Sequence, residues 1–310
     1  MTCSAGAELV GEQLEGSSPE AVGWLALEQS GPWGPKAFTA SHLDPGVGAA
    51  IEAAAAAHGV RPALVRRPGR HADAHADRAH DARRVLVAHT RPGASWLLSG
   101  TVAAPDDVLA VDWAAIAAGD ADAVRRSLPS LTVVDRPQLL VCTNGTRDVC
   151  CAVRGRPVAL GAAERHPGRV WEVTHTSGHR FAPTAVVLPA GTLHGWLDVG
   201  AAGALLSAAD GGATVLDGSR GRSTWPGPAQ VAELAVRRSV DETGLDALDV
   251  TEHHNVAEHA WATTVTHRDG RRWRVHTASE PTDAERAESC AKPLKALRRW
   301  TWTVEELPVR

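Results

Sequence analysis

Two cysteines and two histidines stand close together near the middle of the chain, in an order that suggests a metal site. Cys142 and Cys151 lie nine positions apart in LLVCTNGTRDVCCAV, and His175 and His179 are the outer residues of HTSGH. Thiolates and imidazoles are the side chains that bind zinc and iron–sulfur centres. These four residues are therefore the candidate ligands, and the kind of metal that they bind would determine the function.

The spacing of the four residues helps to distinguish the kinds of metal centre. Structural zinc sites commonly place two cysteines about two to four residues apart, whereas Cys142 and Cys151 enclose a loop of eight residues. A wide loop and a second pair of ligands suit a 2Fe–2S cluster, in which each pair can bind one iron. Two histidines replace two cysteines on one iron of a Rieske centre. Rieske motifs each combine one cysteine with one histidine, however, and this chain keeps the two types apart.

The sequence around these residues resembles a known family. The segments CTNGTRDVCCAVRGRPVA and WEVTHTSGHRFAPTAVVLPAG, the early GPWG and the late SCAKP are similar to the sucrase/ferredoxin-like family of thioredoxin-like ferredoxins. The resemblance covers most of residues 1–200 and part of the tail. It implies a 2Fe–2S cluster on a Cys-x₈-Cys pair and a His-x₃-His pair. Those spacings select Cys142 with Cys151 and His175 with His179, although Cys150 stands beside Cys151.

The proposed ligand set predicts a one-electron carrier whose reduction is coupled to proton uptake. We expect Cys142 and Cys151 on one iron, and His175 and His179 on the other, solvent-accessible iron. An added electron makes the second nitrogen of a ligating imidazole more basic, because negative charge favours its protonated form. The resemblance implies electron transfer but does not name the reductase or the electron acceptor.

The elements that must position these residues follow the same order in both halves of the chain. In the first half, apolar and β-branched runs predict strands at 24–29, 61–67, 83–90 and 95–102, and a helix is expected at 44–58. In the second half, similar runs predict strands at 138–144, 169–176, 184–191 and 194–200, and helices are expected at 154–166 and 201–209. A loop between 138–144 and 154–166 is expected to carry the cysteines. This order predicts an α/β fold in which a thioredoxin-like mixed sheet with flanking helices occurs twice in tandem.

The rest of the chain is expected to form a C-terminal extension. Residues 220–228 suggest a linker, 228–243 a helix, 263–279 a hairpin that turns at Asp269-Gly270, and the tail one more strand. The expected domains are therefore an N-terminal unit without the cluster motif, the ferredoxin domain and this extension, at residues 1–135, 136–225 and 226–310.

Composition excludes several classes of function. The chain has 310 residues and a net charge of −4, which gives no reason to expect nucleic-acid or membrane binding. No apolar run approaches the length of a membrane span, and no signal peptide is evident. Five cysteines, two of them adjacent, are unlike a secreted disulfide framework and favour a cytoplasmic protein whose thiols bind metal. Cys3 and Cys290, near the two ends, are expected to be free structural thiols.

Two alternatives remain open at this stage. One is a thiol–disulfide oxidoreductase that uses Cys150 and Cys151, or Cys142, although the chain has no C-x-x-C motif. The other is a structural or regulatory zinc module. An electron carrier is preferred to a catalyst. The histidine-rich segment 71–80 is expected to be a solvated loop, and His253, His254 and His259 are expected to be ordinary polar residues near a strand.

Overall fold

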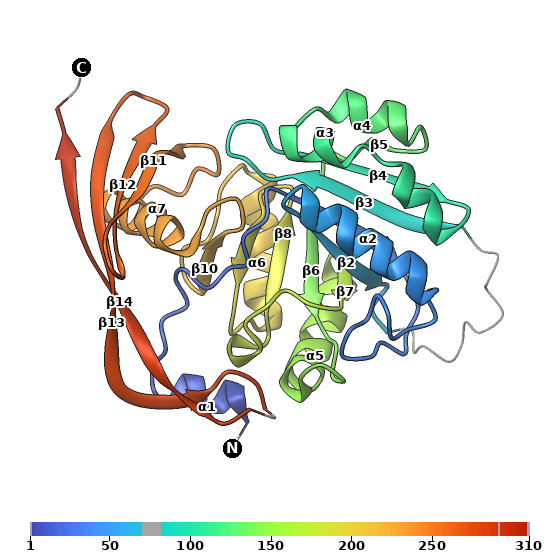
Figure 1. The fold of residues 1–310 in the computed structure, drawn as a ribbon, viewed down its shortest axis with the longest axis horizontal. Helices are drawn as coiled ribbons and strands as arrows, with labels where there is room; N and C mark the ends of the chain where they lie inside the picture. Colours follow the sequence, from blue (N-terminus) through green and yellow to red (C-terminus); the bar gives the residue numbers. More distant parts are fainter. Residues whose placement is uncertain (1, 70–81, 291, 309–310) are drawn as a thin grey trace.

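The structure is a computed structural model, and it describes residues 2–69, 82–290 and 292–308. It contains one large mixed sheet, a smaller antiparallel sheet and helices packed on both (Figure 1). The helices are α1 Cys3–Leu9, α2 Pro45–Ala57, α3 Trp113–Ala118, α4 Ala121–Ser127, α5 Val149–Arg165, α6 Val199–Asp210 and α7 Gly227–Val240, with 3₁₀ helices η2 Pro105–Ala110 and η3 His179–Phe181. The mixed α/β fold predicted from the sequence is confirmed. The histidine-rich segment 71–80 lies outside the described residues.

The large sheet has ten strands in the order β10-β9-β8-β6-β7-β2-β1-β3-β4-β5. Its strands are β1 Gly23–Glu28, β2 Val60–Arg66, β3 Arg83–His89, β4 Trp96–Val102, β5 Thr132–Val133, β6 Gln138–Cys142, β7 Val170–Val173, β8 Ala185–Leu188, β9 Thr192–His194 and β10 Ser219–Arg222. In each half two strands run parallel, β1 with β2 and β6 with β7, and the next strand pairs antiparallel with the first. The two halves therefore share one thioredoxin-like strand order.

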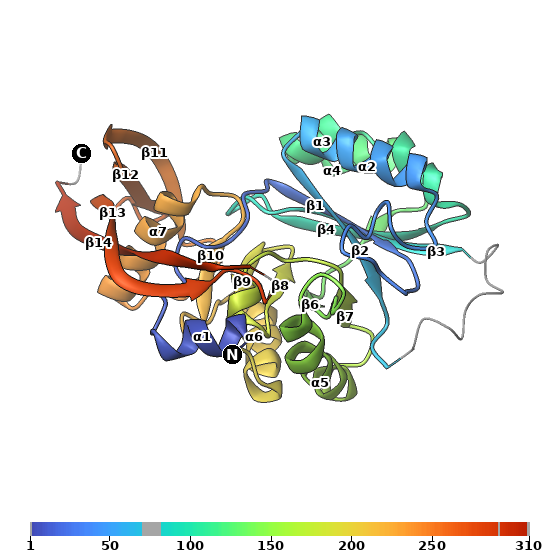
Figure 2. The same cartoon turned by 60° about the horizontal axis from the view of Figure 1, so that its bottom comes forward.

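The halves join edge to edge, where β2 and β7 pair antiparallel and Val65 lies opposite Val173. Helices α2, α3 and α4 cover the outside of one half and α5 and α6 the outside of the other (Figure 2). The inner faces of both halves contribute to one hydrophobic cluster, which we call the inner core. It consists of Cys3, Ala21, Trp24, Ala26, Ala63, Val65, Leu86, Ala88, Leu97, Leu140, Cys142, Cys150, Cys151, Trp171, Val173, Ala182, Val186, Leu188 and Leu193. Burial of this apolar surface stabilises the join between the two halves.

The C-terminal part contains the helix, hairpin and tail strand expected from the sequence, together with one strand that was not expected, β11. Helix α7 packs against a four-stranded antiparallel sheet of β11 Leu248–Ala257, β12 Ala260–His267, β13 Arg272–Ala287 and β14 Leu294–Leu307. The expected hairpin turn at Asp269-Gly270 joins β12 to β13. His253 and His254 lie on β11, and His259 lies in the turn that follows it.

The long β13–β14 hairpin extends from the C-terminal sheet to helix α1 at the other end of the chain (Figures 1 and 2). Glu12, just after α1, is buried and pairs with Arg286 of β13 through two contacts of 2.5 and 2.6 Å. A buried carboxylate of this kind is stable only when it is paired. The two ends of the chain are therefore held against each other. Helix α1 was not predicted from the sequence.

Several boundaries differ from those predicted. Residues 219–222 form strand β10, a buried edge strand of the large sheet, where a linker was expected. The strand expected at 194–200 ends at His194, because residues 195–198 lead into α6. Helix α5 begins at Val149, five residues earlier than expected. The division into domains at 135 and 225 remains a prediction. Among the residues that the structure describes, every helix is too short or too polar to span a lipid bilayer.

Candidate metal centre

Cys142 and His175 come together because β6 and β7 are parallel neighbours. Cys142 is the last residue of β6 and lies opposite Val173, the last residue of β7. His175 follows two residues later, so both ligand candidates lie at the same edge of the sheet. The carboxyl ends of parallel strands are a common location for binding sites. The position of these two residues follows directly from the strand pairing.

Cys151 is brought to Cys142 by helix α5. The helix begins after Asp148, whose carboxylate accepts a hydrogen bond from the Cys150 N–H at 3.0 Å, so Cys151 lies in the first turn and not in a loop as predicted. Gly155 lets the helix approach the end of β6, since a Cβ there would lie 2.3 Å from the Cys142 carbonyl oxygen. The N-cap at Asp148 therefore places the start of the helix five residues before the predicted one.

The two cysteines and the two histidines form one contiguous group. The Cys151 Sγ and the His179 Nδ1 are 3.5 Å apart, and the rings of His175 and His179 stack with their centroids 4.9 Å apart. The Cys142 sulfur contacts both Cys151 and His175. Both thiols are fully buried, whereas both imidazoles are only partly buried. The group therefore has an inner, sulfur side and an outer, nitrogen side.

Electrostatics favour the metal-binding protonation states of Cys142, His175 and His179, whereas the thiol of Cys151 holds its proton. The Cys151 thiol donates to Cys142, and this hydrogen bond lowers the pKa of Cys142 and raises that of Cys151. Burial lowers the pKa of His175 to about 4 and also lowers the pKa of His179. Both imidazoles are therefore neutral near pH 7, which is the form that binds metals.

The four candidate ligands are not gathered as closely as the ligands of a single metal ion. Around one metal ion, ligand atoms crowd to within about 4 Å of one another. Among the described residues, one group of three or more Cys, His, Asp or Glu side chains has all its ligand atoms within 4.8 Å of one another. That group lies around Asp148 and does not include the four candidates. Two thiolates and two imidazoles are a donor set that a 2Fe–2S cluster can use, because two histidines replace two cysteines on one iron of a Rieske centre. The donor set therefore fits 2Fe–2S.

The loop that carries the histidines is held by Arg220, a residue that the sequence had placed in a linker. Arg220 is fully buried on β10, and its Nη1 donates to the carbonyl oxygens of Thr176 and Ser177 at 3.3 and 3.1 Å. A Cβ on Gly178, which has φ +67°, would lie 2.5 Å from the Arg220 Nη2. Burial lowers the pKa of Arg220 to about 9, so it still carries its charge at pH 7. It is a buried cation beside the candidate ligands.

We expect Arg220→Met to destabilise the histidine loop by about 3 kcal/mol, because several buried carbonyl groups lose their donor. In urea unfolding, the Arg220→Met variant should therefore lose its iron at a lower urea concentration than the wild type. Arg222→Met is the matched control, since Arg222 is equally buried but donates to Leu245 in the C-terminal part. Equal iron loss in both variants would show that Arg220 has no particular role at the ligands.

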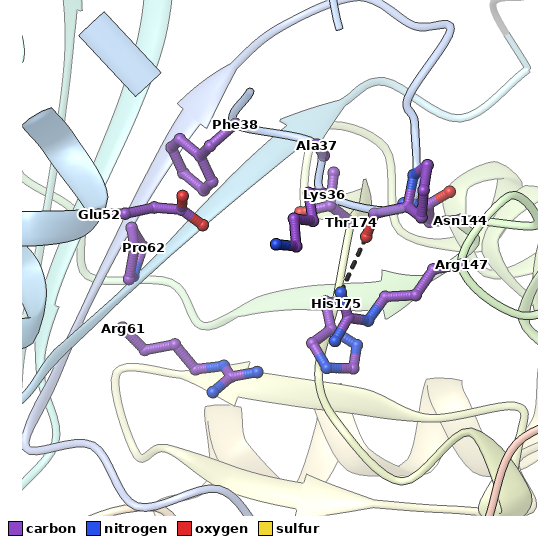
Figure 3. Close-up of a pocket in the computed structure, with 11 residues that line it drawn as sticks. Lys36, Ala37, Phe38, Glu52, Arg61, Pro62, Asn144, Arg147, Thr174 and His175 are labelled. Carbon is purple, nitrogen blue, oxygen red and sulfur yellow. Dashed lines mark hydrogen bonds between the residues drawn. The ribbon is translucent and has the colours of Figure 1, made fainter. Parts of the chain in front are cut away.

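A cavity of about 390 Å³ opens beside His175. Lys36, Arg61 and Arg147 line it and lie around the imidazole, with Glu52 across the opening (Figure 3). Burial, followed by the charge of Arg147, lowers the pKa of Arg61 to about 10. The cavity next to the nitrogen side of the group therefore has an excess of positive charge.

A family model described as sucrase/ferredoxin-like matches residues 17–253. The chain belongs to the sucrase/ferredoxin-like family. The match covers both halves of the large sheet and leaves Cys3 and Cys290 outside it. No curated protein and no solved structure matches this sucrase/ferredoxin-like chain. Membership confirms the resemblance seen in the sequence, while the four ligands themselves remain a prediction.

The other sequence candidates have different surroundings in this sucrase/ferredoxin-like protein. The Cys150 sulfur contacts Cys3 and Cys290, and these two also contact each other although they are far apart in sequence. All five cysteines are free. The sequence showed only that Cys3 and Cys290 lie near the chain ends, and no local motif signals their convergence on Cys150.

Proposed function

We propose that this protein is a cytoplasmic 2Fe–2S electron carrier with Cys142, Cys151, His175 and His179 as cluster ligands. The observation that carries the proposal is the contact of the Cys142–Cys151 pair with the His175–His179 pair, in a chain of the sucrase/ferredoxin-like family. The bound cluster would supply one-electron chemistry. The residues of the chain would bind it, exclude water from its sulfur side and exchange protons at the histidines.

The burial of the ligands supports a direction for electron exchange. Cys142 and Cys151 are each 1% exposed, while His175 and His179 reach the surface. Electron transfer to a partner is fastest where the protein layer is thinnest, so the histidine side is the proposed point of contact. The positive cavity at His175 favours a partner surface or small molecule that carries negative charge.

The first test is the visible spectrum and metal content of anaerobically purified protein. We expect charge-transfer bands between about 400 and 550 nm that bleach on reduction, and about two irons per chain. A colourless protein would contradict the proposal. Iron without bands that bleach would contradict it as well.

A thiol–disulfide oxidoreductase is the second candidate, because the Cys142 and Cys151 thiols are in contact and the pKa of Cys142 is lowered by the Cys151 thiol. A disulfide between them would leave the histidines without a role in binding. Iron-free protein with one titratable dithiol that includes Cys142 would favour this candidate over the electron carrier.

A further inference from the structure

Three cysteines and one aspartate form a second cluster of metal-binding side chains, separate from the four candidate cluster ligands. Cys3 is the first residue of α1, Cys150 lies in the first turn of α5, and Cys290 lies in the turn between β13 and β14. Asp148 is the N-cap of α5. One ligand atom from each of the four lies within 4.8 Å of all the others.

The three sulfur atoms form a nearly regular triangle. The Sγ–Sγ distances are 3.6 Å from Cys3 to Cys150, 3.3 Å from Cys150 to Cys290 and 3.5 Å from Cys290 to Cys3. Tetrahedral zinc with Zn–S bonds of about 2.3 Å separates its sulfurs by roughly 3.8 Å. A disulfide, with sulfurs about 2.05 Å apart, would have to draw two of them much closer. The triangle is near the size that one ion requires.

Asp148 completes the set from one side. Its Oδ1 lies 3.3 Å from the Cys290 sulfur and 3.6 Å from the Cys3 sulfur. Tetrahedral zinc with one oxygen and three sulfur ligands gives O–S distances of roughly 3.5 Å. We propose that Cys3, Cys150, Cys290 and Asp148 bind one zinc ion, which ties both ends of the chain to the start of helix α5.

Hydrogen bonds around the cluster orient its ligands. The Ser289 hydroxyl and the Cys290 N–H each donate to the Asp148 Oδ2 at 2.8 Å, and the Cys150 N–H donates to Oδ1 at 3.0 Å, which holds the carboxylate beside the sulfurs. The Cys3 N–H donates to the Cys290 sulfur at 3.4 Å. Outer contacts of this kind fix the geometry of metal ligands and support their negative charge. Burial opposes ionisation of Asp148, but hydrogen bonds led by that from the Cys290 N–H lower its pKa to about 2.

The ligand types favour zinc over other ions. Three thiolates are too soft a set for magnesium or calcium, which bind through oxygen. The carboxylate makes the set less suited to Cu(I), which prefers sulfur ligands alone. Cys3, Cys150 and Asp148 are buried, and only Cys290 is exposed, so the ion would be structural and closed to substrate.

The site would act on the fold and not on the redox chemistry. It joins α1, α5 and the β13–β14 turn. Cys3 and Cys290 each lie more than 130 residues from Cys150 along the chain. Two of its ligands, Cys3 and Cys290, lie outside the segment that matches the family. Because Cys150 precedes Cys151 directly, the ion would also fix the first turn of the helix that carries a candidate cluster ligand.

The test is the zinc and iron content of full-length protein purified after growth with zinc, with Cys3→Ser and Cys290→Ser as variants. We expect about one zinc per chain, and a loss of zinc affinity of more than about 100-fold in each variant, since outer-contact mutations alone cost 10–100-fold. The iron content and visible spectrum should be unchanged. Glu288→Ala is the matched control, because Glu288 lies next to the same turn but pairs with Lys295 and should leave zinc in place.

The two metals are scored separately, so failure of the zinc proposal is distinct from failure of the electron-carrier proposal. Wild-type protein without zinc would overturn the zinc site, as would zinc retained in both variants. A loss of two mass units in non-reducing mass spectrometry, removed by either Ser substitution, would show a disulfide instead. Zinc titration of the chelator-treated wild type, with unfolding followed by circular dichroism, covers the case in which a variant does not fold. If zinc does not raise the midpoint of this unfolding transition, that result would also contradict the zinc site.

Discussion

Cys142→Ser and Cys151→Ser should each abolish the bound iron, whereas Cys150→Ser should keep it. Serine is isosteric with cysteine but supplies no thiolate, so each of the first two variants leaves one iron a ligand short. The Cys150 sulfur contacts Cys3 and Cys290 and not the histidines. Iron per chain and absorbance between about 400 and 550 nm measure the effect, and we expect a drop from about two irons to near zero in the two ligand variants.

The neighbouring Cys150 serves as the matched control for Cys151, since both lie in the first turn of α5 and are equally buried. Under the zinc proposal, Cys150→Ser loses zinc while it keeps iron. The reverse result, with iron lost from Cys150→Ser and kept in Cys151→Ser, would exchange the two assignments. Far-UV circular dichroism of each variant separates ligand loss from unfolding.

The sequence predicted those elements whose structure is set by local pattern. The apolar runs that became β1, β2, β3, β4 and β6 were placed within two residues of their ends, because each strand contains a run of buried apolar residues. The start of α2 was also correct, since Asp44 and Pro45 form an ordinary N-cap and first position. The order of these elements was enough to predict the mixed sheet.

The sequence did not predict features that depend on distant parts of the chain. Strand β10 contains Arg220 and Arg222, which no pattern rule assigns to a buried strand. These guanidinium groups are buried only because carbonyl groups of other segments accept their hydrogen bonds. The joining of β2 to β7 is likewise a long-range pairing with no local signal.

The two metal-binding groups illustrate the same difference. Cys142, Cys151, His175 and His179 were found together because they lie within 38 residues and have family spacings. Cys3 and Cys290 are 287 residues apart, and their contact follows from the closure of α1 onto the β13–β14 turn. Glu12 and Arg286 stabilise that closure as a buried ion pair. Spacing along the chain therefore identified one group and could not identify the other.

The reduction potential of the wild-type protein should fall as pH rises, by up to about 59 mV per pH unit where one proton accompanies the electron. Reduction adds negative charge beside His175 and His179, so the free nitrogen of each imidazole holds its proton more tightly in the reduced protein. Below the pKa of the oxidised form both states are protonated, and above that of the reduced form neither is. The potential is flat in both ranges and slopes between them. A potential that is constant from about pH 6 to pH 9 would exclude this coupling.

The double variant His175→Cys/His179→Cys should keep a cluster whose potential is lower by roughly 200 mV or more and independent of pH. Two neutral imidazoles become two thiolates, so the reduced centre carries two additional negative charges and is harder to form. No ligand nitrogen remains to exchange a proton. Protein-film voltammetry from about pH 6 to pH 9 measures both effects. The double variant His253→Cys/His254→Cys, on β11 in the C-terminal sheet, is the control and should match the wild type. An unchanged potential and spectrum in the first variant would mean that His175 and His179 are not ligands. If the potential only loses its pH dependence and does not fall, the exchanged proton lies on these histidines, but the charge of the ligands has little effect on the potential.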